Sequence, residues 1–213
     1  TRGQGDAGGG AGFAYATAWS LGARELSTLV QPGAAGFGRA TYHGPMPFTD
    51  YPNYFGWLWL ALAATAAAAG RRSLAAALGA AVALSLLVAL GDQSPGLYQA
   101  LYAALLYFDK FRVPSMILVV AALAAAALAA HGAAALAATG PTSDRARRWA
   151  GLALGAIGAV TFLTAAAGVG AGSYRDALAS LAAASGKPTA PALLEEAWRL
   201  HRGFLVREGL ILL

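Results

Sequence analysis

Residues 108–120 read FDKFRVPSMILVV, and this stretch predicts a corner at which a membrane-spanning helix begins. Three charged residues, Asp109, Lys110 and Arg112, stand just before a proline and a long run of apolar residues. Pro114 suits the first turn of a helix, because the N–H that proline lacks would have no partner there. We therefore expect the charges to lie at the level of lipid headgroups, with the helix running from them into the hydrocarbon.

The composition of the whole chain is that of a membrane protein. Hydrophobic residues make up 58% of it and charged residues only 12%, whereas charged residues make up roughly a quarter of an ordinary soluble domain. The chain has no cysteine, which excludes disulfides and thiolate metal sites. His43, His131 and His201 show no metal-ligand spacing. We expect no metal, no cofactor and no nucleic-acid partner, since no basic face with interleaved aromatics accompanies the net charge of +5.

Four apolar segments are long enough to cross a bilayer, which takes roughly 17–25 helical residues. They cover residues 54–70, 73–91, 113–139 and 149–172. A fifth begins near residue 203 and reaches residue 213, which is too short to span alone. The predicted fold is an all-α integral membrane protein with four transmembrane helices plus an incomplete fifth, and outward-facing interfacial helices. We expect a piece of a longer membrane protein, or a chain whose ends were not defined.

Basic residues predict the orientation of these helices. They gather in two short connections, at Arg71 and Arg72 and at Arg145, Arg147 and Arg148. Because short basic loops stay in the cytoplasm, the opposite segments are expected outside. Those segments are residues 1–53, residues 92–112 and a helical hairpin at 173–202, with the start of a further transmembrane helix at 203–213.

Two outer segments carry recognisable patterns. Residues 97–108, LYQALYAALLYF, have aromatic or apolar side chains on nearly every face, which predicts a helix lying in the membrane interface. In the hairpin, the sequence SGKPT at 185–189 separates two short helices. Trp198 is interpreted as an interface anchor; alternatively, the hairpin covers an outer groove as a lid.

Three stretches give the chain a family resemblance. They are ELSTLVQPGAAGFG at 25–38, TYHGPMPFTDYPNYFGWLWLALA at 41–63 and GDQSPGLYQALYAALLYFDKFRVPSMILVV at 91–120. Their order and spacing resemble the later part of bacterial YfhO-like membrane proteins, over roughly residues 20–130. Those proteins are related to the GT-C glycosyltransferases, which use a lipid-phosphate-linked sugar on the outer face of the membrane. The resemblance implies a multi-pass protein of the bacterial inner membrane that contributes an outer-face groove to a sugar transferase.

The resemblance leaves the catalytic residues unknown, because the acidic first outer loop of GT-C enzymes has no matching segment here. Arg112 and Lys110 are candidates for binding a lipid phosphate, such as that of a polyprenyl-phosphate sugar. Asp109 would restrain one of them as an ion pair. The alternative is that both cations simply extend to the lipid headgroups.

Glu25 and Asp50 are candidate support residues, because the resemblance puts both on the outer side. The alternative for Glu25 is a helix cap or a surface charge. The alternative for Asp50, between Pro47 and Pro52, is a turn residue.

A second function class remains open from the sequence. The chain could be a non-catalytic accessory subunit that packs, through helix faces rich in small residues, within a larger respiratory, photosynthetic or transport complex. Its partners would then be further transmembrane segments or subunits, together with membrane lipid.

Overall fold

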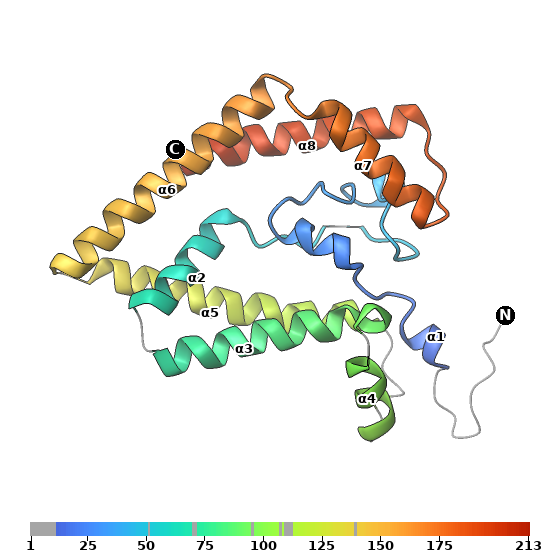
Figure 1. Cartoon of the computed structure of the whole chain (residues 1–213), viewed down its shortest axis with the longest axis horizontal. Helices are drawn as coiled ribbons and strands as arrows, with labels where there is room; N and C mark the ends of the chain where they lie inside the picture. Colours follow the sequence, from blue (N-terminus) through green and yellow to red (C-terminus); the bar gives the residue numbers. More distant parts are fainter. Residues whose placement is uncertain are drawn as a thin grey trace.

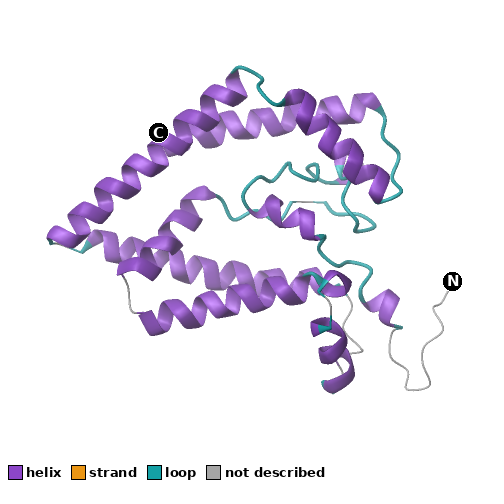
Figure 2. Ribbon diagram, viewed as in Figure 1, coloured by secondary structure: helices purple, strands orange, loops and turns teal. Residues whose placement is uncertain are grey.

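The computed structural model describes residues 12–50, 52–69, 72–94, 96–106, 108, 113–138 and 140–213. Within these residues the chain is all-helical, as predicted, and an isolated bridge between Ala34 and Gly36 is the nearest approach to a strand (Figure 2). The helices form two layers that meet at one end and spread apart at the other, with an irregular segment between them (Figure 1).

The first layer contains α2 (Trp57–Ala69), α3 (Arg72–Ala89) and α5 (Leu118–Ala137). Both α2 and α3 pack against α5 (Figure 1). The helices approach so closely that a Cβ added at Gly132 of α5 would lie 1.8 Å from the carbonyl oxygen of Leu62 on α2. Small residues at a crossing let two backbones approach in this way, as they do in membrane helix pairs.

The second layer contains α6 (Pro141–Ala166) and α8 (Pro191–Leu212), joined by α7 (Ala171–Ala184). α8 runs back along α6 (Figure 1). Glycines again mark the crossing, because a Cβ at Gly158 would lie 2.8 Å from the carbonyl oxygen of Gly209. Both layers therefore depend on positions where a larger side chain would separate the backbones.

Among the residues that the structure describes, two helices are long and apolar enough to cross a membrane. They cover Pro114–Ala137 and Arg147–Ala166. Trp57–Ala66 and Ser73–Ala89 are apolar but shorter. α2 has 13 residues, about 20 Å at 1.5 Å per residue, against a hydrocarbon core of roughly 30 Å. It starts only at Trp57, later than the sequence pattern predicts, because residues 52–56 are not helical.

The irregular segment between the layers is here called the cap, residues 12–50 and 52–56. It contains α1 (Phe13–Ala16) and two 3₁₀ helices, η1 (Ala23–Leu29) and η2 (Arg39–Thr41). Backbone hydrogen bonds attach it to the first layer: the Leu21 N–H donates to the Ala89 carbonyl at the end of α3, at 2.8 Å. A buried cluster that includes Leu21, Tyr42 and Met46 of the cap reaches Leu118 and Ala121 of α5.

The helix boundaries correct two sequence predictions and agree with a third. α4 covers Leu97–Ala104 and not 97–108, because the backbone of Leu105 is extended and the chain leaves the helix there. A 3₁₀ turn, η5 (Pro114–Ile117), precedes α5 with its proline at the first position, as expected for the corner. α8 is continuous through Gly203, where we expected a new helix to begin, since one glycine without a capping residue before it does not stop a helix.

Candidate lipid groove and buried Glu25 cluster

A groove of about 440 Å³ opens where α2 and α5 begin, beside the cap. Its walls combine residues from all three: Pro52, Asn53, Tyr54, Phe55, Trp59, Ser115, Met116, Leu118, Val119 and Ala122. The polar residues Asn53 and Ser115 precede α2 and α5, whereas the apolar residues Trp59, Val119 and Ala122 lie within these two helices. A lining that is polar beside the cap and apolar along the helices suits a lipid, whose headgroup and chain need these two environments.

The η5 corner shapes this groove. Val113 adopts a left-handed conformation, with φ of 72°, which is costly for a β-branched residue. The corner is attached to the cap by the Ser115 N–H, which donates to the Trp19 carbonyl at 3.3 Å. The turn leaves the Met116 side chain 70% exposed, so the corner presents an apolar side chain outward.

A second, apolar groove of about 370 Å³ lies on the other side of the same corner. Its lining residues come from α3, α4 and the corner: Val88, Tyr98, Phe108, Val113, Pro114, Met116, Ile117 and Val119. Met116 and Val119 line both grooves. The described part of the corner, η5 and the start of α5, therefore contributes to both grooves.

The predicted phosphate-binding residues Arg112 and Lys110, and their predicted partner Asp109, lie outside the described residues. The sequence places Arg112 directly before Val113. The roles of Arg112, Lys110 and Asp109 in binding a lipid phosphate stay a prediction.

Glu25 is buried within the cap and has a defined structural role. Its side chain is only 1% exposed. One carboxyl oxygen accepts a hydrogen bond from the Gly22 N–H at 2.8 Å, and the other accepts one from the Tyr42 hydroxyl at 2.6 Å. Glu25 therefore caps the start of η1, in agreement with the helix-cap alternative, and is not a surface charge. Burial raises its pKa, although both hydrogen bonds act in the opposite direction.

Lys187, from the SGKPT loop, contacts Tyr42 and Met46 beside Glu25. Its Nζ donates to the Met46 carbonyl at 2.7 Å and lies 4.0 Å from the centre of the Tyr42 ring. The Tyr42 hydroxyl also accepts a hydrogen bond from the Met46 N–H at 3.0 Å. Burial lowers the pKa of Lys187, while the nearby Glu25 carboxylate raises it. We call Glu25, Tyr42, Met46 and Lys187 the Glu25 cluster; it ties the hairpin loop to the cap.

The Glu25 cluster lies directly behind the groove. A small cavity of about 10 Å³ adjoins Glu25, Tyr42 and Met46, and its wall includes Pro52 and Asn53. Those two residues also line the groove. The cluster therefore supports the segment that carries Pro52 and Asn53 of the groove.

Asp50 does not join this cluster. Its carboxylate pairs with Arg39 at 3.5 Å, and both side chains are more than half exposed. The residue lies in a bend of the cap, in agreement with the alternative of a turn residue. Glu25 and Asp50 are thus two separate features, one buried and one at the surface.

The hairpin meets the cap through aromatic residues. The Tyr174 hydroxyl donates to the Gly33 carbonyl at 2.7 Å, and its ring stacks on His201 with centroids 4.5 Å apart. Trp198 packs against Tyr174, with ring centroids 5.5 Å apart, and is only 7% exposed. Trp198 is therefore a buried contact within the protein, and its interpretation as a membrane-interface anchor is wrong.

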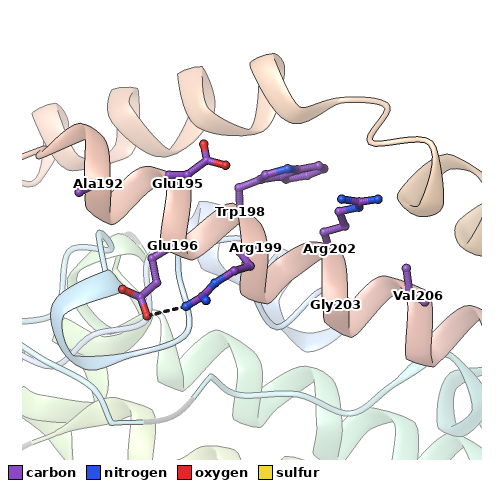
Figure 3. A pocket seen from close by; sticks show the side chains of 8 residues that line it. All are labelled: Ala192, Glu195, Glu196, Trp198, Arg199, Arg202, Gly203 and Val206. Atoms are coloured by element: carbon purple, nitrogen blue, oxygen red, sulfur yellow. Dashed lines mark hydrogen bonds and ion pairs between the residues drawn. The ribbon is translucent and has the colours of Figure 1, made fainter.

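Another hollow is an open groove of about 750 Å³ along α8 (Figure 3). Its lining consists of Ala192, Glu195, Glu196, Trp198, Arg199, Arg202, Gly203 and Val206. The charges there are already paired: Arg199 contacts Glu196 at 3.3 Å, and Glu195 pairs with Arg175 of α7 at 2.7 Å. Arg202 donates to the Ala165 and Ala166 carbonyls at 2.8 and 2.7 Å, where a cation satisfies the end of α6. The charged side chains of this groove therefore have partners within the second layer.

Sequence reasoning missed Tyr42, Lys187, Tyr174 and Gly33. Each belongs to a contact between segments far apart in the chain, and no spacing rule connects them. In the part of the chain that the structure describes, no group of three His, Cys, Asp or Glu side chains could hold a metal ion. No protein-family model, curated protein or solved structure matches the chain.

Proposed function

We propose that the chain is the membrane-embedded part of a protein related to the GT-C, lipid-linked sugar transferases, and that it contributes a lipid groove on the outer face of the bacterial inner membrane. The observation that carries the proposal is the groove between α2 and α5, with the polar residues Asn53 and Ser115 beside the cap and an apolar wall along the helices. A bound polyprenyl phosphate would lay its chain along the apolar wall.

The arrangement of the helix ends supports a four-helix crossing by α2, α3, α5 and α6. The end of α2, the start of α3 and the corner between α5 and α6 lie on the left in Figure 1, and the sequence puts the arginine-rich connections there. The cap, α4 and the loop between α7 and α8 lie at the opposite end (Figure 1). In this proposal the arginine end is cytoplasmic, in keeping with the positive-inside rule, and the cap faces outward.

The surfaces of the helices also support immersion in lipid. Leu152, Val160 and Leu163 of α6 are each more than 60% exposed, as is Leu123 of α5, which would be unfavourable in water but not in hydrocarbon. The short α2 would be accommodated by local thinning of the bilayer.

In this proposal Arg112 and Lys110 bind the lipid phosphate near the mouth of the groove, with Asp109 restraining them. Glu25 supports the site from behind, since the Glu25 cluster fixes the segment that carries Asn53. Asp50 holds a turn at the edge of the cap through Arg39. None of these roles is catalytic.

The experiment is a binding measurement with polyprenyl phosphate on the purified chain in lipid nanodiscs. Arg112→Gln should weaken binding by about 1.5–3 kcal/mol, as for the loss of a charged hydrogen bond, and Arg112→Lys should recover only part, because lysine lacks the planar fork. Ala122→Phe should also weaken binding by filling the groove. Leu152→Phe, on the exposed face of α6, is the matched control and should bind normally. Equal affinity for all four variants would refute the groove as the lipid site.

The alternative, a non-catalytic accessory subunit, is favoured by one observation. Most of the apolar surface of α6 is uncovered, which would also suit the side of a helix that packs against further transmembrane segments. The same binding measurement separates the two, because an accessory subunit has no reason to select a polyprenyl phosphate over an ordinary phospholipid.

A further inference from the structure

His201 lies where the hairpin contacts the cap. We call this contact, made by Gly33, Tyr174 and His201, the joint; its surroundings suit a neutral imidazole. The side chain is 5% exposed. Its ring is nearly parallel to that of Tyr174, with an angle of 10° between the planes. Its Nδ1 has no hydrogen-bond partner and lies so near Gly33 that a Cβ there would be 2.4 Å away. The ring therefore fills the space beside Gly33, and its Nδ1 makes no hydrogen bond there.

The same joint helps to hold the hairpin on the cap, together with the contacts of Lys187 to Met46 and Tyr42. The hydrogen bond from the Tyr174 hydroxyl to the Gly33 carbonyl spans it, and the Phe204 ring lies 6.4 Å from that of Phe37. A displacement of His201 away from Gly33 would move Tyr174 with it, because the two rings are stacked. Such a displacement would therefore release two contacts between hairpin and cap together.

The groups around His201 offer no charge to balance an imidazolium. The cap segment at 31–37, QPGAAGF, has no charged residue. From α7, Tyr174 presents a phenol whose pKa burial raises further, and Arg175 pairs with Glu195. On α8 itself, Arg202 is bonded to the end of α6. Among the described residues, no carboxylate pairs with the imidazole. A second proton would place an unpaired positive charge in a buried joint, which is strongly unfavourable.

We propose that His201 is an acid-sensitive latch: its neutral ring keeps the α7–α8 hairpin docked on the cap, and its protonation releases the hairpin. Burial lowers the pKa of the docked imidazole to about 4, from 6.5 for a free one. Release is therefore expected as the pH falls from 6.5 toward 4. This inference does not depend on the proposed lipid groove.

The test uses the full chain in nanodiscs, with cysteines at the exposed positions Ala40 of the cap and Thr189 of the hairpin loop. Since the chain has no cysteine of its own, both can carry spin labels, and electron paramagnetic resonance reports their separation. At pH 7.5 we expect one short separation. At pH 4 a longer one should dominate, while the helical circular dichroism signal stays unchanged. His201→Phe should keep the short separation at both pH values, and His131→Gln, a control in α5, should behave like the native chain.

The outcome that overturns the latch is equally direct. A native chain that keeps the short separation down to pH 4 would refute it, as would release at the same pH in His201→Phe. If the phenylalanine is too large to dock at pH 7.5, His201→Asn gives the same comparison with a smaller neutral side chain. Loss of the helical signal together with the short separation would mean general unfolding and would also refute a local latch.

Discussion

The first helical layer and the cap are held together in opposite ways. In the layer, α2 and α5 touch through small and apolar side chains, with the Leu62 carbonyl against Gly132. In the cap, Glu25, Tyr42 and Lys187 are partly or fully buried polar groups that bond across large distances in the sequence. The close packing of the layer requires a position without a side chain at Gly132. The stability of the cap requires each buried polar atom to have a hydrogen-bond partner.

This difference follows from what each region has to bury. A helix satisfies its own backbone N–H and C=O groups, so its surface needs only to fit. An irregular segment leaves many backbone groups without regular partners, and buried ones must be paired by side chains or by distant backbone. The following predictions test this contrast, from the largest expected effect to the smallest.

The largest effect is expected at the glycine crossing in the first layer. Gly132→Leu should lower the free energy of unfolding by more than about 3 kcal/mol, because the added atoms meet the Leu62 backbone and the helices must separate. Thermal unfolding in detergent micelles, followed by circular dichroism, measures the change. Gly79→Leu in α3 is the matched control, since nothing lies within 4 Å of a Cβ there. Equal losses at the two positions would contradict close packing of α2 on α5.

The next effect is the pH dependence that His201 gives to the joint between hairpin and cap. Its pKa is depressed in the folded chain, to about 4 against 6.5, so its stabilising contribution is fully present above pH 6.5 and is lost as the pH falls through 4. The difference corresponds to about 3 kcal/mol. Urea unfolding from pH 7 to pH 3.5 should therefore show a steeper loss for the native chain than for His201→Phe. Parallel curves would contradict the burial of a neutral His201.

A moderate effect is expected in the Glu25 cluster. Tyr42→Phe removes the hydroxyl that donates to Glu25 and accepts from the Met46 N–H. It should cost about 1–3 kcal/mol, because buried polar groups lose their partner. Urea unfolding at pH 7 measures it. If the variant unfolds like the native chain, the cap is not held by this network.

The smallest effect is expected at the surface of the cap. Asp50→Asn breaks an exposed ion pair with Arg39, and exposed pairs contribute about 0–1 kcal/mol. Urea unfolding should give a difference within that range, shrinking further in high salt. A loss as large as that of Tyr42→Phe would show that Asp50 has a structural role beyond its turn.

The same contrast explains what the sequence could predict. The all-helical fold and the proline corner before α5 follow from local signals, namely long apolar runs and the place of Pro114. The length of α2 did not follow, because Tyr54 and Phe55 look as apolar as the helix but belong to the cap. The Glu25 cluster joins residues 25, 42 and 187, and no local pattern indicates a partnership across such distances. The burial of Trp198 could not be predicted from its sequence neighbours for the same reason, since it depends on contact with Tyr174 of α7.

The most direct test of the proposed outward cap and four membrane crossings is to measure on which side of the membrane each end of the helices lies. Cysteines placed singly at Gln93 and Thr189 should react with an impermeant thiol reagent added outside intact cells. One at Ser143, beside the arginine-rich corner between α5 and α6, should react only after the membrane is opened. This pattern is the one that an outward cap and four membrane crossings require. Labelling of Ser143 from outside, with Gln93 and Thr189 protected, would contradict both the orientation and the outer-face groove.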